Sequence, residues 1–268
     1  IGYVICDSDS SQIEARTLAW LAEQNDLVAD FEAGRDVYKI MASAIYKKPD
    51  SDISTDERFV GKQTILGSGY GMGAKKFKAQ LRNFNVRMDE ELTKHIINTY
   101  RDTYPNIPVL WRKAHEALGW IANDQTGEFG RGGLLKVEGS RGILLPNGLY
   151  LKYPNLRMLI SEETGKGEYV YDTKKGKSIV PNRIYGGKVV ENVCQALARI
   201  VIGEQMLMIA KKYQVVMTVH DAVACLIPED QANTGKEFVE LCMRLRPKWA
   251  ADLPLNCEAG YGSSYGEC

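Results

Sequence analysis

The pattern of apolar and polar residues predicts strands near both ends of the chain and helices between them. Residues 3–9 form an apolar run typical of a strand, and the next segment, SQIEARTLAWLAEQ, repeats its apolar residues at helical spacing. From about residue 25 to residue 130 the pattern is mainly helical. Within this block, STDERFVGKQTIL is expected to begin at an N-cap on Ser54 or Thr55, with Glu57 in its first turn. The glycines of GSGYGMG are expected to end that helix.

After Gly127 the pattern changes to short strands separated by glycines. The segment PNGL supplies an Asn-Gly turn between apolar runs, and EYVYDTKKGKSIV is typical of a second hairpin. A long apolar helix is expected over residues 188–212, buried along the back of a sheet. The runs VVMTV and AVACLI follow, separated only by His220 and Asp221. They predict a tight hairpin over residues 214–227 with Asp221 near its tip.

Composition indicates a globular protein of one large or two smaller domains. The chain has 268 residues, 44% of them hydrophobic, and no apolar run of the length that a membrane span needs. Its six cysteines show no CxxC pairing and no clustering with histidine, so neither a zinc site nor a disulfide framework is indicated. We therefore expect reduced thiols and a cytoplasmic location.

The charge balance limits how the chain can bind nucleic acid. There are 34 basic and 34 acidic residues, so bulk positive charge cannot attract DNA and any contact must come from local patches. Two basic segments, AKKFKAQLR and YDTKKGK, contain such patches. A solvated helix face explains the first segment equally well, and a polar hairpin tip explains the second better than DNA binding does.

Three further segments carry candidate chemistry. Asp9 and Asp221 each stand at the end of an apolar run, where a sheet would expose a carboxylate. Between them, RFVGKQTILGSGYG contains polar and aromatic residues spaced by four, namely Arg58, Lys62, Leu66 and Tyr70. Each step of four turns a helix by about 400°, so neighbours in this series share a face.

In this order, the segments DSSQIE, RxxxKxxxLGxxYG and VHDAV resemble motifs A, B and C of the family A DNA polymerases, the group of bacterial DNA polymerase I and many phage replicases. The resemblance implies an α+β fold, with an antiparallel palm sheet backed by helices and a mainly helical fingers subdomain inserted into it. The palm would comprise residues 1–24 and 136–268, and the fingers residues 25–135, with the motif B helix at 55–70. The chain would be a fragment of a longer polypeptide that lacks the thumb and exonuclease domains, acting as a monomeric core, and LGSGYGMG favours a phage origin.

The resemblance also implies a metal-dependent reaction, in which dNMP is transferred from dNTP to a primer 3′ hydroxyl and pyrophosphate is released. Two Mg²⁺ ions, for which Mn²⁺ can substitute, would be bridged by Asp9 and Asp221, with the backbone carbonyl of Ser10 as a further ligand. Asp7 is an alternative to Asp9 from the residues alone, since positions two apart on a strand point the same way. The following SQIE identifies Asp9 as the match. Lys62 would protonate the leaving pyrophosphate as a general acid.

The same resemblance assigns binding roles to residues around these carboxylates. Glu14 would exclude a ribose 2′ hydroxyl, and an exposed helix charge is the alternative interpretation of this residue. The expected nucleotide-binding set is Ser10, Gln12, Glu14, Arg58, Lys62, Leu66 and Tyr70. The expected set for primer-template DNA is Gly71, Asn192, Gln195, Arg199 and His220.

Two residues depart from the family pattern. Leu66 stands where relatives carry an aromatic residue, and Ala222 replaces the glutamate that follows the His-Asp pair. Because of these departures, an alternative hypothesis is a nucleic-acid-binding module that derives from a polymerase and has lost its catalytic activity. A single-subunit RNA polymerase is a further alternative, which Glu14 disfavours.

Overall fold

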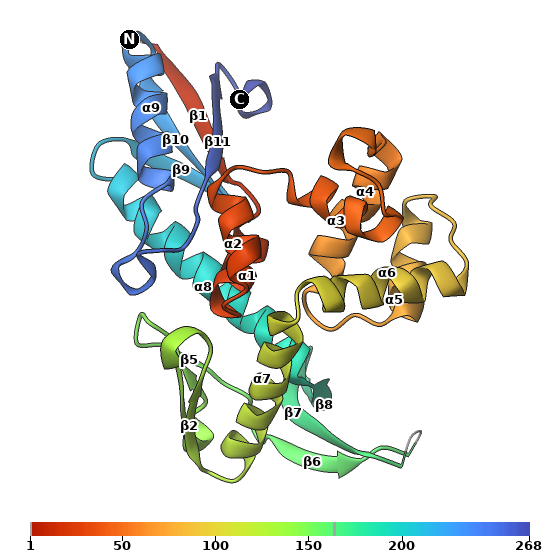
Figure 1. The fold of residues 1–268 in the computed structure, drawn as a ribbon. Coiled ribbons are helices and arrows are strands. Elements are labelled where there is room, and N and C mark those ends of the chain that lie inside the picture. Colours follow the sequence, from red (N-terminus) through yellow and green to blue (C-terminus); the bar gives the residue numbers. More distant parts are fainter. Residues whose placement is uncertain (1, 163–164) are drawn as a thin grey trace. The chain divides into compact units, whose positions relative to one another are not determined.

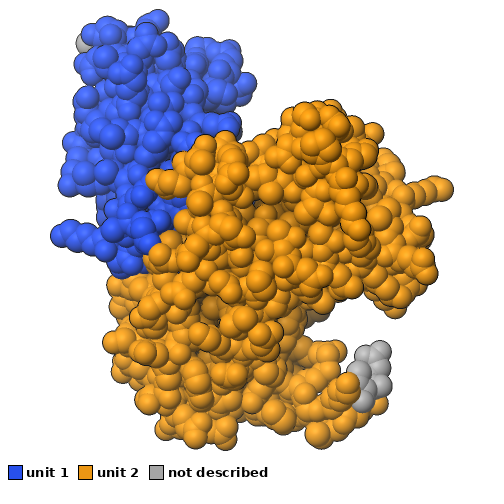
Figure 2. Space-filling model, in the orientation of Figure 1, with its two compact units in different colours: residues 1–17, 194–268 blue, residues 18–193 orange. Residues whose placement is uncertain are grey.

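The computed structural model describes residues 2–162 and 165–268. Contacts between residues divide the chain into two compact units, coloured separately in Figure 2. Unit 1 contains residues 1–17 and 194–268, and unit 2 contains residues 18–193. This grouping differs from the palm and fingers division expected from the sequence, which stays a prediction.

Unit 1 is built on one antiparallel sheet of strand order β11-β1-β10-β9 (Figure 1). The two ends of the chain therefore pair with each other: β1 lies between β10 and β11. Helix α9 packs against β1, β10 and β11. The bounds of these elements are β1 Tyr3–Ser10, β9 Gln214–Val219, β10 Ala222–Pro228, α9 Ala232–Met243 and β11 Cys257–Gly262.

Burial along β1 alternates as a half-buried strand requires. Cys6, Ser8 and Ser10 are buried on one face, whereas Asp7 and Asp9 lie on the other face and keep contact with water. The sequence prediction of a strand that delivers a carboxylate is confirmed by this arrangement.

Unit 2 contains a helical part and two small antiparallel sheets, of order β2-β3-β4-β5 and β6-β7-β8. Its helices are α2 Asn25–Glu32, α3 Val37–Tyr46, α4 Thr55–Ser68, α5 Ala74–Asn83, α6 Glu90–Thr103 and α7 Asn106–Ala122. The first sheet comprises β2 Thr126–Phe129, β3 Leu135–Glu138, β4 Ile143–Leu144 and β5 Tyr150–Leu151. The second comprises β6 Arg157–Ile160, β7 Gly167–Lys175 and β8 Ser178–Ile184.

Two helices contain residues of both units, namely α1 Ile13–Leu21 and α8 Gly186–Ile209. Helix α8 is the long apolar helix that the sequence predicts at 188–212. In unit 1 its buried residues include Leu197, Val201 and Ile202.

Local sequence signals explain most of the element boundaries. Ser54 caps α4 with a capping box, in which its side chain accepts from the backbone N–H of Glu57 at 3.2 Å and the Glu57 carboxylate accepts from the backbone N–H of Ser54 at 3.0 Å. The Asn-Gly turn joins β4 and β5, with Gly148 at a φ of 81° that suits glycine. Mixed helices and antiparallel sheets therefore confirm the predicted α+β fold class.

Helices α3 and α4 approach each other closely at a glycine. A Cβ placed on Gly61 would lie 2.1 Å from the backbone oxygen of Tyr38, so only glycine allows this packing. The contact fixes the motif B helix against α3.

Candidate active site

The carboxylates of the first and third motifs come together at one end of the sheet of unit 1, with Asp9 on β1 and Asp221 in the turn between β9 and β10. Asp9 lies directly opposite Ala222, the residue after Asp221. Next to this pair, the backbone N–H of Ser10 donates to the backbone oxygen of Asp221 at 3.3 Å. The end of β1 and the turn between β9 and β10 are therefore joined where the two aspartates stand.

The turn that carries Asp221 contains only two residues, as the sequence predicts. Val219 pairs with Ala222, and His220 takes a left-handed conformation with a φ of 53°. Such a φ is uncommon for a residue with a side chain, although histidine tolerates it better than most. The strained residue and the predicted metal ligand are thus neighbours.

The side chain of Asp9 is surrounded by negative charge. Partial burial raises the pKa of Asp9, and the carboxylates of Asp221, Asp7 and Glu258 raise it further. Glu258 is the cross-strand partner of Asp9 on β11. Sequence reasoning missed Glu258 because nothing near it in the chain predicts that β11 pairs with β1.

A hollow of about 310 Å³ lies beside Asp221 in unit 1. It brings together five of the predicted site residues with three apolar ones. The lining residues are Ile13, Glu14, Gln195, Ala198, Arg199, Ile202, His220 and Asp221. Helices α1 and α8 thus place a carboxylate, an amide and a guanidinium around the motif C turn.

Arg16 holds the turn between β1 and α1 in place. Its side chain is buried, its Nε donates to the backbone oxygen of Ser11 at 2.8 Å, and its Nη1 donates to the backbone oxygen of Pro254 at 3.1 Å. Gln12 lies in this turn with a φ of 53°, and its Oε1 accepts from Arg16 Nη2 at 3.5 Å. Local sequence does not reveal this role of Arg16, because Pro254 lies near the other end of the chain.

Motif B lies in unit 2, where Arg58 and Lys62 flank one aromatic ring. The Arg58 guanidinium lies 5.3 Å and Lys62 Nζ 5.9 Å from the ring centroid of Tyr38. Arg58 Nε also donates to Asp36 Oδ2 at 2.6 Å. Leu66, farther along α4, is exposed. The predicted shared face is confirmed for the three residues that lie within the helix.

Asp36 is the acidic partner that the sequence did not reveal. Partial burial opposes its ionisation, but hydrogen bonds from Arg58 and from the backbone N–H groups of Lys39 and Tyr38 outweigh that and lower the pKa of Asp36. Its carboxylate also caps α3 through those two backbone groups. Any anion that binds Arg58 therefore competes with Asp36.

Tyr70 lies just beyond α4, in a turn that is contacted by α7 and by the start of α8. Helix α4 ends at Ser68, and Trp111 Nε1 donates to the backbone oxygen of Gly69 at 2.8 Å. A Cβ on Gly187 would lie 2.4 Å from the Tyr70 backbone oxygen, so α8 begins in close contact with this turn. A hollow of about 620 Å³ adjoins Gly71 and is also lined by Trp111, His115 and Tyr185, among other residues of unit 2.

Asn192, one of the predicted DNA-binding residues, has a hydrogen bond to a buried tyrosine. Its Nδ2 donates to the hydroxyl of Tyr153 at 3.2 Å, and that tyrosine is buried. Gln195, one turn later on α8, is exposed.

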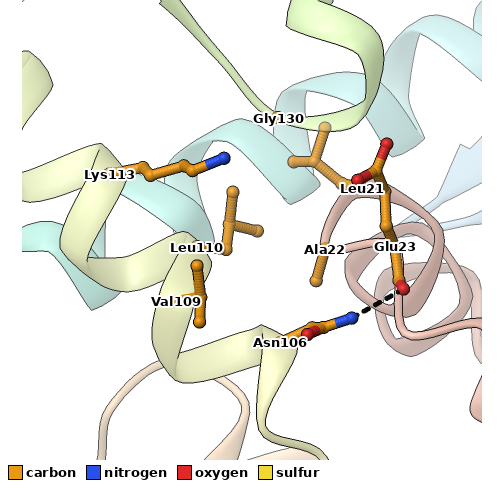
Figure 3. Close-up of a pocket in the computed structure, with 8 residues that line it drawn as sticks. All are labelled: Leu21, Ala22, Glu23, Asn106, Val109, Leu110, Lys113 and Gly130. Atoms are coloured by element: carbon orange, nitrogen blue, oxygen red, sulfur yellow. Dashed lines mark hydrogen bonds between the residues drawn. The ribbon is translucent and has the colours of Figure 1, made fainter.

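Another hollow of unit 2 contains none of the predicted site residues. Figure 3 shows Lys113 and Glu23 on opposite sides of it, and Asn106 Nδ2 donates to the Glu23 backbone oxygen at 2.8 Å. Its volume is about 100 Å³. This small site links the end of α1 to the start of α7.

Comparison with known proteins connects this arrangement to one family. The sequence model described as DNA polymerase family A matches residues 2–119, which include the first two motifs. The DNA polymerase of Bacillus phage SP02 is 29% identical over 265 residues, 96% of this chain. Residues 2–119 are thus similar to DNA polymerase family A, and relatives that match nearly the whole chain are DNA polymerases.

Two further similarities extend over nearly the whole chain, one in sequence and one in fold. DNA polymerase I of Borreliella burgdorferi is 22% identical over 266 residues, 99% of this chain. The polymerase domain of Pol1 from M. smegmatis, solved in complex with DNA primer-template and dNTP, covers 100% of the chain with a TM-score of 0.65 and 17% identity. The chain spans 40% of the phage relative, 25% of the Borreliella relative and 41% of the Pol1 chain.

The carboxylates around Asp9 fit a divalent cation whose remaining ligands are other oxygens. Asp7 Oδ1 is buried without a hydrogen-bond partner, and the negative charges around Asp9 are of the kind that a cation relieves. Within residues 2–162 and 165–268, no group of three or more His, Cys, Asp or Glu side chains is placed to hold a metal ion. Mg²⁺ commonly binds one or two carboxylates together with water and substrate phosphates. The aspartates described here are therefore consistent with a site at which other ligands complete the metal coordination.

The described part of the chain contains no helix both long and apolar enough to span a membrane.

Proposed function

We propose that the chain carries the nucleotidyl-transfer site of a template-directed DNA polymerase. The observation that carries the proposal is that the motif A aspartate at the end of β1 and the motif C aspartate in the β9–β10 turn are neighbours, joined by the Ser10–Asp221 backbone hydrogen bond. Primer-template DNA and dNTP are the proposed substrates. The DNA and dNTP in the M. smegmatis Pol1 complex belong to the same chemical classes.

Asp9 and Asp221 are the proposed ligands for two Mg²⁺ ions, with the Ser10 carbonyl beside them. When bound, these ions lower the pKa of the primer 3′ hydroxyl and neutralise the pyrophosphate that leaves. The protein's contribution at this point is position, because the sheet fixes both carboxylates by backbone pairing rather than by a flexible loop.

The other predicted residues bind and orient the substrates in this proposal. Arg58 and Lys62 contact the triphosphate, and Lys62 donates a proton to the leaving pyrophosphate. Glu14 excludes a ribose 2′ hydroxyl, and its place in the lining of the hollow beside Asp221 supports that role. His220, Gln195 and Arg199 contact the primer terminus and the minor groove, together with Asn192, while Tyr70 and Gly71 contact the template.

Primer extension tests the proposal directly. The chain is incubated with a labelled primer-template, Mg²⁺ and either dNTPs or rNTPs, beside an Asp221→Asn variant of equal melting temperature. Extension with dNTPs alone, lost in the variant, is the expected result. Extension with rNTPs would favour an RNA polymerase, and DNA binding without extension would favour a module whose chemistry has lapsed.

A further inference from the structure

A line of cations lies on one side of helix α5 in unit 2. Lys75, Lys78 and Arg82 are three and four residues apart, so they share one side of the helix, while Phe77 and Leu81 are fully buried on another. Arg87, in the loop that follows, is exposed and joins them. These four residues are referred to below as the α5 basic face.

The positive charge of this face is weakly compensated. Among the residues that the structure describes, no ion pair within 4.0 Å involves any of its members. At the start of α6, Glu90 interacts electrostatically with Lys78 and Lys75 but forms its ion pair with Lys94 at 2.8 Å, and Asp89 caps the helix through Leu92 N at 2.7 Å. Since the whole chain has 34 basic and 34 acidic residues, this concentration of charge is local.

The face also contains a hollow of suitable size. Lys78, Arg82, Asn85, Arg87 and Met88 line about 410 Å³ between the end of α5 and the loop before α6. Pockets that take small organic ligands fall in this size range, and this one presents cationic donors. A phosphate with its sugar is a chemically matched occupant.

An aromatic ring is exposed at the C-terminal end of the same helix. Phe84 is 50% exposed and packs edge-on against Phe59 of α4, with ring centroids 5.4 Å apart and an interplanar angle of 72°. One edge of the ring is thus anchored while the rest stays accessible. Cations along a groove with an aromatic platform are the combination that binds single strands.

The cations extend along a line rather than converging on a point. From Lys75 to Arg82 the helix rises by about 10 Å, which suits successive phosphates of a strand better than one isolated phosphate. Helix α5 is tied to the motif B helix, since Gln80 Nε2 donates to Gln63 Oε1 at 3.0 Å. A strand on this face would therefore be held next to α4.

We propose that the α5 basic face binds the phosphate backbone of single-stranded DNA, with Phe84 stacking on a base. The assignment of that strand as the unpaired template rests on the proposed polymerase function. Binding itself does not, so it is measured without nucleotide, metal or extension.

The test is the salt dependence of binding to a fluorescein-labelled oligothymidylate, followed by anisotropy. For single strands the slope of log K against log salt changes by about 0.7 for each phosphate that a cation no longer neutralises. We expect Lys78→Ala/Arg82→Ala to reduce the slope by about 1.4 and to weaken binding on the order of tenfold at moderate salt. The matched control is Lys174→Ala/Lys175→Ala, which removes two exposed lysines from β7 and should leave the slope unchanged.

Two single variants keep the test valid if the double variant is unstable. Arg87→Ala lies outside the helix and should reduce the slope by about 0.7. Phe84→Ala should weaken binding roughly fivefold or more without changing the slope, because stacking releases no counterions. Melting temperatures of all variants are compared first.

Several outcomes would overturn the proposal. A wild-type slope in both Arg87→Ala and the α5 double variant, or an equal decrease of slope in the β7 control, would remove the specific role of this face. An equal decrease in affinity for blunt duplex would assign the face to double-stranded DNA, and displacement by free dNTP would assign it to nucleotide. If single-strand binding follows the expectation while primer extension is absent from the wild-type chain, the polymerase function fails and this inference stands.

Discussion

The backbone N–H of Ser10 donates to the backbone oxygen of Asp221 at 3.3 Å, which joins the first motif of the chain to the third. The bond lies at the end of the β1–β10 ladder, where Asp9 faces Ala222. Two carboxylates from opposite ends of the sequence are thereby fixed on one sheet. Their spacing depends on backbone pairing, so side-chain changes should alter their chemistry without separating the strands.

The crowding around Asp9 predicts a gain in stability on its neutralisation. Since the pKa of Asp9 is raised above 3.8 in the fold, its ionisation costs stability as pH rises from that value through the folded pKa, and the cost persists at neutral pH. Water screens part of this repulsion because Asp9 is exposed. We expect Asp9→Asn to raise the melting temperature at neutral pH, without divalent ions, by no more than about 2 to 4 °C.

The pH profile of melting distinguishes this cause from a packing effect. Below about pH 3.8 the carboxylate is protonated in both states, so the difference between wild type and Asp9→Asn should vanish. Glu258→Gln should give part of the same gain, because it removes one of the negative neighbours. A gain that is independent of pH would contradict the electrostatic explanation.

The Arg58–Asp36 ion pair predicts competition with the incoming nucleotide. Asp36→Asn removes the negative charge but leaves an oxygen that can cap α3. An exposed ion pair contributes up to about 1 kcal/mol, so dNTP affinity should improve by up to about fivefold. Fluorescence titration with dNTP measures the change, and Arg58→Gln should abolish it in the double variant.

Because His220 has a left-handed backbone conformation, substitutions can test its backbone role and the role of its imidazole separately. At a φ of 53°, glycine is favoured over alanine by about 1 kcal/mol. His220→Gly should therefore be more stable than His220→Ala in urea unfolding. If the imidazole positions the primer, both variants lose extension equally, and full activity in His220→Gly would eliminate that role.

Gly187 predicts a steric constraint on the turn that carries Tyr70. A Cβ at this position would lie 2.4 Å from the Tyr70 backbone oxygen and 2.8 Å from its carbonyl carbon. Gly187→Ala should destabilise the protein by about 1 to 3 kcal/mol, since backbone must move. In the same helix, a Cβ on Gly203 would meet no heavy atom within 4 Å, so Gly203→Ala should be neutral or stabilising. Similar unfolding free energies for the two variants would contradict this explanation.

Local signals made much of this fold predictable from the sequence. The capping box at Ser54 and Glu57, the Asn-Gly turn and the tight turn at His220 and Asp221 all depend on a few adjacent residues. The long helix is predicted at 188–212 and observed at Gly186–Ile209, because its apolar pattern extends over many turns. The predicted and observed ends differ by two or three residues because a periodic apolar pattern determines the ends of a helix less well than its middle.

The missed residues all depend on contacts between distant segments. Glu258 pairs with Asp9, Asp36 binds Arg58, and buried Arg16 donates to Pro254. Each of these acts through a partner far along the chain, and no local periodicity encodes such pairings. Asp9 and Asp221 could be chosen from the sequence only because their motifs resemble those of a known family.

The central claim is that Asp9 and Asp221 act as one metal-dependent site, and a double-mutant cycle in primer extension tests it most directly. Losing a ligand to a metal that supplies several kcal/mol should slow extension by roughly a thousandfold or more. Residues that work as a unit are non-additive, so Asp9→Asn, Asp221→Asn and the double variant should lose activity to about the same extent. Losses that multiply in the double variant, or wild-type extension in either single variant, would contradict this claim.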